Sequence, residues 1–214
     1  ILGAGTDEIT IKGVKRLNGT TFKIPADRIE AGTYLIAAAL TNGKITINKI
    51  DSKRMDAILL NLKKAGAHII SNDQSITLDM RDNKIMPVDI ITEPFPGFPT
   101  DMQAQFTVLN CMSNGSASVK ETIFENRFMH VQELNRMGTD ITINGTTAFI
   151  KGVDSISGAQ VMATDLRASA SLILAGLVAQ GETVVDRIYH IDRGYERIEE
   201  KLTGLGAEIE RLPN

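Results

Sequence analysis

The sequence predicts an α/β domain with helices inside and sheets outside, and two observations support this fold class. A unit of helix, strand, helix and strand recurs three times along the 214 residues. In each unit the first helix is nearly all apolar or small, as in Tyr34–Leu40 and Ser169–Ala175. Because a helix that is apolar on every side must be enclosed by other elements, we expect three sheets packed around buried parallel helices with three-fold pseudosymmetry.

Capping signals and alternating segments predict the individual elements. The capping-box pattern that opens helices occurs at Asp27–Glu30 and at Thr100–Gln103. Alternation of apolar and polar residues in Lys44–Ile50 and Glu182–Ile188 predicts half-buried strands after the first helices. Each unit is therefore expected to contain a capped buried helix, a strand, an amphipathic helix and a further strand.

Glycines at matching positions predict where the helices of each unit end, because a left-handed glycine commonly follows the last helical turn. The paired glycines are separated by 23, 23 and 25 residues, namely Gly43 and Gly66, Gly115 and Gly138, and Gly181 and Gly206. This regular spacing supports the three-unit interpretation.

Four arginines, Arg28, Arg127, Arg167 and Arg193, are predicted to lie in the first turn of helices. The helix dipole favours acidic residues there, so basic ones indicate an anionic ligand. Free backbone N–H groups and a guanidinium together bind phosphate or carboxylate. We therefore expect an anion-binding catalytic domain in which several helices point at one pocket.

Charge and hydropathy limit the function classes. The net charge of −3 argues against a general nucleic-acid or membrane-surface binder, because those proteins carry excess basic charge. Apolar runs such as Leu35–Leu40 are too short to span a bilayer, and no basic-then-apolar leader opens the chain. The simplest placement is cytoplasmic.

Cysteine and histidine usage predicts no internal disulfide and no metal site. The single Cys111 lies in an apolar run and is expected to be a buried thiol. His68, His130 and His190 lack companions at metal-ligand spacing. His130 is either a structural histidine or a residue that faces the site.

The first 25 residues are expected to belong to another domain. Ile1–Gly5 resembles the helix stop and strand start at Leu62–Ala67, but without the preceding helix. Residues 1–25 are therefore predicted to complete a missing N-terminal companion domain. Residues 26–214 are predicted to form the three-repeat domain.

Four long segments closely resemble the UDP-N-acetylglucosamine enolpyruvyl transferase family, and the similarity runs through essentially the whole chain. They are Phe98–Phe106, Phe124–His130, Ser157–Ala170 and Asp186–Arg197. The resemblance implies the C-terminal part of an inside-out α/β barrel enzyme from the bacterial cytoplasm. It further implies transfer of enolpyruvyl from phosphoenolpyruvate to the 3′-hydroxyl of UDP-N-acetylglucosamine in peptidoglycan synthesis, without a cofactor.

The resemblance also implies roles for individual residues. Asp101 is the favoured base at the sugar hydroxyl, and Asp165 is a second active-site carboxylate. Arg193 joins the arginines that hold the carboxylate and phosphate of phosphoenolpyruvate, and the backbone of Ile123 contacts the sugar. The full set of implied substrate-binding residues is Thr100, Asp101, Ile123, Arg127, Arg167, Arg193 and Arg28.

Several alternatives stay open at this point. Asp101 can simply complement a helix dipole, Asp165 can be only a cap, and Arg28 can bridge a hinge between domains. The shikimate-pathway enolpyruvyl transferase shares the fold and chemistry. A non-catalytic binding fragment is the other alternative, since the family's loop cysteine, lysine and asparagine from the N-terminal half are missing. The isolated chain is expected to be inactive.

Overall fold

Three buried helices form the centre of the domain in the computed structural model, which describes residues 1–6 and 8–212. Their residues are mostly small or apolar, and all nine residues of the middle helix are buried. The helices pack against one another, as the sequence predicts for helices that are apolar on every side. They are α1 (Arg28–Leu40), α3 (Gln103–Cys111) and α5 (Leu166–Gly176).

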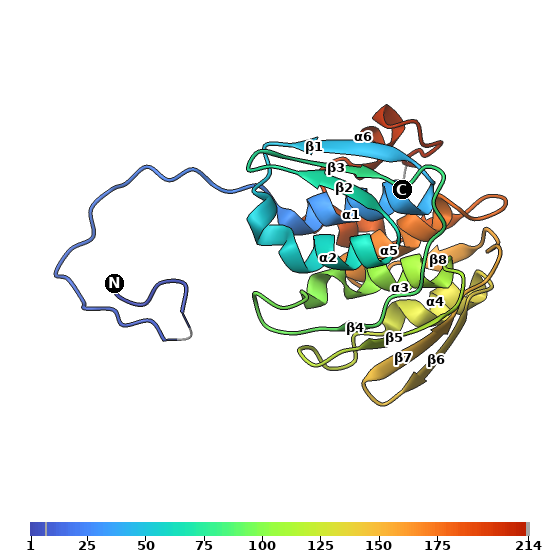
Figure 1. Ribbon diagram of the computed structural model, residues 1–214, viewed down its shortest axis with the longest axis horizontal. Helices are drawn as coiled ribbons and strands as arrows, with labels where there is room; N and C mark the ends of the chain where they lie inside the picture. The colour runs from blue at the N-terminus through green and yellow to red at the C-terminus, as the bar shows by residue number, and fades with distance from the viewer. Residues whose placement is uncertain (7, 213–214) are drawn as a thin grey trace.

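Three sheets lie around these helices (Figure 1). The first is antiparallel, in the order β1-β3-β2, with β1 at Lys44–Asn48, β2 at His68–Ser71 and β3 at Ser75–Asp79. The second has the order β4-β5-β7-β6, with β4 (Ile90–Ile91), β5 (Ser116–Lys120), β6 (Asp140–Asn144) and β7 (Thr147–Lys151). The third pairs β8 (Gln160–Met162) with β9 (Val184–Asp186) in parallel.

Shorter helices cover the remaining surface, and their ends agree with the predicted glycine stops. Gly66, Gly138 and Gly206 follow the helices Asp56–Lys64, Met129–Arg136 and Ile198–Gly204 with φ of 101°, 95° and 101°, which glycine adopts without strain. None of the described helices has the length and apolar character to cross a membrane. These shorter elements are η1 (Ser52–Met55), α2 (Asp56–Lys64), η2 (Thr100–Met102), α4 (Met129–Arg136), η3 (Ile188–Arg193) and α6 (Ile198–Gly204).

Several local predictions are wrong. Asn42, with φ of 50°, takes the left-handed position after α1 that was expected for Gly43. Gly181 lies beyond the end of α5, because the chain continues through a turn after Gly176. The strand expected after Gly206 is not present in residues 207–212, and β3 and β7 were not anticipated.

Residues 1–6 and 8–26 extend away from the body of the domain (Figure 1). A short bridge between Leu2 and Thr10 is the pairing that the structure describes there. Large apolar side chains of this segment are exposed, among them Leu17 and Phe22. Such side chains normally pack against another surface, so the segment is not part of the core.

Candidate functional site

Asp101 and two arginines form a half-buried ion cluster at the N-terminal ends of α3 and α5. The carboxylate accepts a hydrogen bond from Arg127 Nη2 at 2.7 Å on Oδ1 and from Arg167 Nη2 at 3.3 Å on Oδ2. Both arginines are largely buried, whereas Asp101 is 40% exposed. The cluster therefore joins one carboxylate to two guanidinium groups, and its most exposed member is Asp101.

The pKa of Asp101 is held below its usual value by the arginines. Burial alone would raise this pKa, but the Coulombic attraction of Arg167 and the hydrogen bonds from Arg127 and Arg167 outweigh it. Asp101 is therefore ionised in this arrangement. The same contacts make it a weak proton acceptor as long as both guanidinium groups remain bound to it.

Local backbone geometry places the two arginines beside Asp101. Asn126, which tolerates the left-handed region, has φ of 55° and turns the chain just before Arg127. Arg127 therefore precedes α4, with Phe128 at the cap position, and the prediction that it lies in the first helical turn is wrong. Arg167 is the second residue of α5, as predicted.

A buried carboxylate lies beneath this cluster. Glu121 accepts a 2.8 Å hydrogen bond from Thr100 Oγ1, and Thr100 Oγ1 in turn accepts one of 2.8 Å from Arg127 Nη1. The predicted capping box at Thr100 is therefore wrong, because the Thr100 hydroxyl donates to Glu121 and η2 has no side-chain cap. Sequence reasoning missed Glu121, which lies at the end of an ordinary alternating strand.

A second buried group, Tyr195, supports Arg167. The Tyr195 hydroxyl is 2.9 Å from Thr33 Oγ1 and accepts hydrogen bonds from Gln105 Nε2 at 3.4 Å and Arg167 Nη1 at 3.3 Å. These partners come from α1, α3 and α5, so one hydroxyl joins the three buried helices. The guanidinium of Arg167 also lies over the Tyr195 ring, 5.6 Å from its centre.

Asp165 is the N-cap of α5. Its Oδ1 accepts hydrogen bonds from the backbone of Arg167 at 2.8 Å and Ala168 at 3.0 Å. The cap is therefore confirmed, and it ties the carboxylate to the helix that carries Arg167. A catalytic role for Asp165 stays a prediction.

His130 is fully enclosed beneath the site. Burial lowers its pKa to about 4, although the charge of Asp165 acts in the opposite direction. Its Nε2 has no hydrogen-bond partner among the described residues. The imidazole is therefore neutral near pH 7 and does not face solvent.

Arg193 does not lie where the sequence predicted it. It is the last residue of η3, not in a first turn, because the helix ends at Gly194. A Cβ at Gly194 would lie 3.0 Å from Leu166 Cδ2, so the glycine permits close approach to the start of α5. The chain at Arg193 thus lies near Arg167, but its side chain is exposed and makes no described ion pair within residues 1–6 and 8–212.

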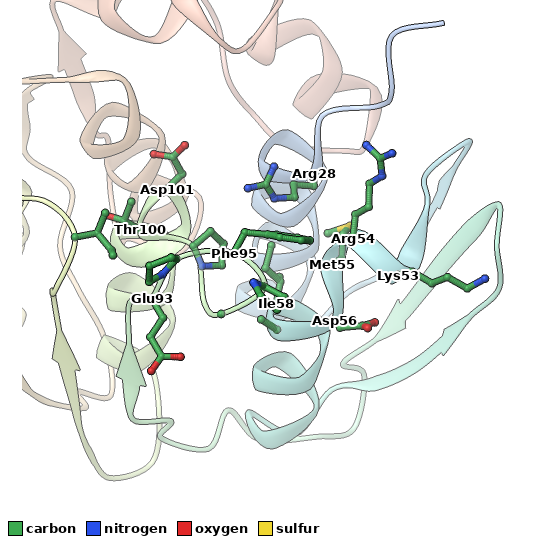
Figure 2. Close-up of a pocket in the computed structure, with 16 residues that line it drawn as sticks. Arg28, Lys53, Arg54, Met55, Asp56, Ile58, Glu93, Phe95, Thr100 and Asp101 are labelled. Atoms are coloured by element: carbon green, nitrogen blue, oxygen red, sulfur yellow. The ribbon is translucent and has the colours of Figure 1, made fainter. Parts of the chain in front are cut away.

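Arg28, Thr100, Asp101 and Ile123 line one cleft of about 260 Å³ (Figure 2). Arg28 begins α1 behind the predicted cap Asp27, and its guanidinium lies over the Phe95 ring, 6.0 Å from the centre. Figure 2 shows Asp101 and Arg28 at separate sides of the cleft, with Phe95 below Arg28. The volume suits a small anion or part of a sugar, and it is below the usual range for an enclosed larger ligand.

A second concave surface of the described residues lies away from the predicted site residues. A larger groove of about 910 Å³ lies at β9, α5 and residues 208–212, and it contains none of the predicted site residues. The smaller cleft is lined by Asp101 of the ion cluster and by Thr100, whereas Arg127 and Arg167 hold Asp101 from outside its lining. No group of three metal-ligating side chains occurs in the part of the chain that the structure describes.

Comparison with known proteins supports the predicted resemblance. The chain is 60% identical over 211 residues to the UDP-N-acetylglucosamine 1-carboxyvinyltransferase of Hydrogenovibrio crunogenus, covering 99% of this chain and 50% of that protein. The corresponding Pasteurella multocida protein is also 60% identical, over 212 residues, with the same coverage. The chain therefore spans about half the length of the curated relatives it matches.

Solved structures share the fold. The enolpyruvyl transferase NikO from Streptomyces tendae matches with a TM-score of 0.79 and 27% identity, over 87% of this chain and 44% of that one. The EPSP synthase from Acinetobacter baumannii matches with a TM-score of 0.72 and 17% identity, over 94% of this chain and 50% of that one. At the latter identity the similarity shows the fold alone.

The family model described as EPSP synthase (3-phosphoshikimate 1-carboxyvinyltransferase) matches residues 1–202. The predicted α/β class is confirmed by this match together with the solved enolpyruvyl transferases. The chain belongs to the EPSP synthase family of enolpyruvyl transferases.

Proposed function

We propose that the complete protein containing this chain transfers enolpyruvyl from phosphoenolpyruvate to the 3′-hydroxyl of UDP-N-acetylglucosamine and releases phosphate. The observation that carries the proposal is the half-buried cluster of Asp101, Arg127 and Arg167, which combines a carboxylate with two guanidinium groups. The names and 60% identity of the curated relatives support the choice of substrates. This reaction would supply the first committed step of peptidoglycan synthesis.

The arginines suit the anionic co-substrate. Phosphoenolpyruvate carries a carboxylate and a phosphate, and guanidinium forks bind both groups with paired hydrogen bonds. In the proposed reaction C3 gains a proton, the sugar oxygen attacks C2, and a tetrahedral adduct forms. Loss of a C3 proton and of phosphate then gives the product. Arg127 and Arg167 stabilise the departing phosphate, and Arg193 completes the set from the end of η3.

Asp101 serves as the base at the sugar hydroxyl in this proposal. Both of its oxygens accept from arginines in the structure, which holds its pKa low. When the substrate anions take over these guanidinium groups, Asp101 loses its stabilising partners and its pKa rises. Substrate binding would thus convert a structural ion pair into a competent proton acceptor.

The other predicted residues complete the proposed site. Asp165 supplies the second carboxylate while capping α5, and the backbone of Ile123 contacts the sugar beside Thr100. Arg28 closes the far wall of the cleft. The cleft of about 260 Å³ cannot enclose a nucleotide sugar, which supports a contribution from the rest of the complete protein.

We further propose that residues 26–214 form three repeated units of an inside-out α/β barrel. Three buried helices, each followed by a strand and a shorter helix, support this arrangement. Residues 1–25 are proposed to belong to an N-terminal companion domain. Their exposed apolar side chains, including Ile11 and Phe22, support this assignment. The isolated chain is expected to be inactive because half of each substrate-contact surface is missing.

A second candidate is 3-phosphoshikimate enolpyruvyl transfer, which the description of the matching family model favours. The two substrates can be separated by thermal stabilisation of the complete protein. We expect UDP-N-acetylglucosamine to raise the Tm and shikimate 3-phosphate to leave it unchanged. The reverse result would replace the proposed acceptor with the second candidate.

Phosphate release tests the reaction itself. The complete protein should release phosphate only when phosphoenolpyruvate and UDP-N-acetylglucosamine are both present, and the isolated chain should release none. Release by the isolated chain would contradict the need for the companion domain. Absence of release by the complete, folded protein with both substrates would contradict the proposed reaction.

A further inference from the structure

The feature that the proposed reaction leaves unexplained is the carboxyl group of Glu121. With 3% exposure, it is the one buried carboxyl side chain among the residues that the structure describes. Moving a carboxylate out of water costs several kcal/mol unless hydrogen bonds replace the lost hydration. No described arginine or lysine pairs with it. The hydrogen bonds of Glu121 must therefore offset this cost.

The two oxygens of Glu121 accept hydrogen bonds from different groups. Oε1 accepts hydrogen bonds from Thr92 Oγ1 at 2.6 Å, Ile123 N at 2.8 Å and Phe124 N at 3.1 Å. This side fixes the backbone at Ile123, which lines the cleft. Oε2 accepts from Thr100 Oγ1 at 2.8 Å. This other side is connected to the charged cluster.

The Thr100 hydroxyl connects Glu121 to Arg127 by two hydrogen bonds. Because its hydrogen points to Glu121, its lone pairs are free to accept from Arg127 Nη1 at 2.8 Å. The neighbouring Nη2 of the same guanidinium then meets Asp101 at 2.7 Å. A planar guanidinium held at both terminal nitrogens has one orientation. The Phe124 ring, 5.0 Å from the guanidinium carbon, restricts it further.

We infer that Glu121 is a positioning residue that sets the orientation of Arg127 through the Thr100 hydroxyl while separately fixing the backbone of Ile123 and Phe124. The inference deepens the proposed function and rests on it for the reaction that the arrangement serves. One buried carboxylate thereby aligns the anion-binding side of the site with the sugar-binding side.

The variant Glu121→Gln separates the bonds at Oε1, which fix the backbone, from the bond at Oε2, which connects to Thr100. The Gln amide oxygen can replace Oε1 and keep the three donors on that side. Its amide nitrogen then replaces Oε2 and cannot accept from Thr100. Thr100→Val tests the same connection without changing the buried carboxylate, so it keeps the test informative if Glu121→Gln folds poorly. Asn110→Ala is the matched control, because Asn110 is also buried but bonds Val88 at the other end of α3.

Steady-state kinetics of the complete protein should show a lower kcat/KM for phosphoenolpyruvate and a nearly unchanged KM for UDP-N-acetylglucosamine. Glu121→Gln and Thr100→Val should each lower kcat/KM for phosphoenolpyruvate on the order of ten- to a hundred-fold, because misplaced groups cost catalysis steeply. The KM for UDP-N-acetylglucosamine should stay within about twofold in Glu121→Gln, because the Ile123 side is preserved. Asn110→Ala should lower the Tm without changing either parameter. The double variant should be no worse than the poorer single one.

Unchanged kinetics in both variants would overturn the inference, as would multiplied effects in the double variant. A measurement without turnover separates this inference from the proposed function. Rotation of the Arg127 guanidinium, followed by nitrogen-15 NMR in this 214-residue chain, should be slow in the native sequence and faster in Glu121→Gln. Equal rotation rates would refute the positioning role. Faster rotation together with an inactive complete protein would instead contradict the proposed reaction.

Discussion

Two ion clusters of the domain have similar chemistry and opposite ratios of cations to anions. At the candidate site one carboxylate, Asp101, pairs with Arg127 and Arg167. Near the C-terminal segment one guanidinium, Arg211, pairs with Asp192 at 2.6 Å and Glu199 at 3.0 Å. Among the directly ion-paired residues, the first cluster has two cations to one anion and the second has two anions to one cation. Only the first is suited to an anionic ligand.

The clusters also differ in how they are supported. The arginine side chains at the site are 15% and 12% exposed, whereas that of Arg211 is 36% exposed. Buried hydrogen-bonding groups, Glu121 and Tyr195, hold the site cluster from below. The pairs of Arg211 have short distances too, so distance alone does not identify a functional cluster. The two clusters are instead distinguished by the burial of their arginines, the buried groups that bond to them and the ratio of cations to anions.

The largest predicted difference concerns turnover of the complete protein. Arg127→Met should lower kcat/KM by about 10²- to 10³-fold, the usual effect of removing one group that stabilises a transition-state charge. Arg211→Met is the matched control, since it removes a guanidinium from the other cluster, and it should stay within about twofold. Phosphate-release kinetics measure both. Comparable losses in the two variants would remove the distinction between the clusters.

Acid should destabilise the region beneath the site before it affects the Arg211 cluster. Buried His130 has a pKa of about 4, against about 6.5 in an unfolded chain. The unfolded state therefore binds one more proton between these values. The free energy of unfolding should fall by up to about 1.4 kcal/mol per pH unit as the pH drops from about 6.5 toward 4.

The Arg211 cluster should respond only at lower pH. Hydrogen bonding to Arg211 lowers the pKa of Asp192, and it lowers that of Glu199 against the opposing effect of burial. Contributions from lowered carboxyl pKa values are present above the unfolded pKa near 4 and are lost below it. Urea unfolding at pH 7.5 and 5.0 should show a smaller decrease for His130→Leu than for the native chain. The exposed His68→Gln should behave like the native chain, and an equal decrease in all three would contradict the assignment.

Removing the Tyr195 hydroxyl should weaken the support of the site cluster. Tyr195→Phe leaves the buried Thr33 hydroxyl, the Gln105 amide and one Arg167 nitrogen without this partner. Thr33 keeps its bond to Ile29 O and Gln105 keeps its bond to Thr33, so the main loss is the bonds to the Tyr195 hydroxyl. The free energy of unfolding should fall by about 1 to 3 kcal/mol. Equilibrium urea unfolding measures it. Tyr189→Phe, at an exposed tyrosine, is the control, and an equal change in both would refute the role of the buried hydroxyl.

The caps of α1 and α5 offer the smallest and most closely matched comparison. Asp27→Ala and Asp165→Ala each remove a carboxylate that caps two backbone N–H groups, so each should cost about 1 kcal/mol of stability. Asp27→Asn and Asp165→Asn keep the capping oxygen. If Asp165 is also a functional carboxylate, only Asp165→Asn should lower turnover. Full activity of Asp165→Asn would leave the cap as its sole role.

Local signals explain what the sequence predicted correctly. The caps at Asp27 and Asp165, the apolar faces of α1 and α5, and the stop at Gly66 all depend on neighbours within one or two helical turns. Such interactions are visible as short patterns. The four quoted segments also identified the family correctly, because long matching stretches are specific.

Contacts between distant segments explain what was missed. Thr100 matched a capping pattern, yet its hydroxyl bonds Glu121, which is 21 residues away. Arg193 stands in a stretch that reads equally well as a helix start or end, and close packing of Gly194 on Leu166 decides the latter. Neither competing partner leaves a periodic signal in the sequence.

Binding of phosphoenolpyruvate tests the central claim, that the arginines around Asp101 hold a small polyanion. Titration calorimetry on the complete protein should show binding that weakens at least about tenfold in Arg167→Met and is unchanged in Arg211→Met, since one charge-assisted contact is worth about 1.5 to 3 kcal/mol. Equal affinity of all three proteins for phosphoenolpyruvate would contradict the claim and place the anion site elsewhere.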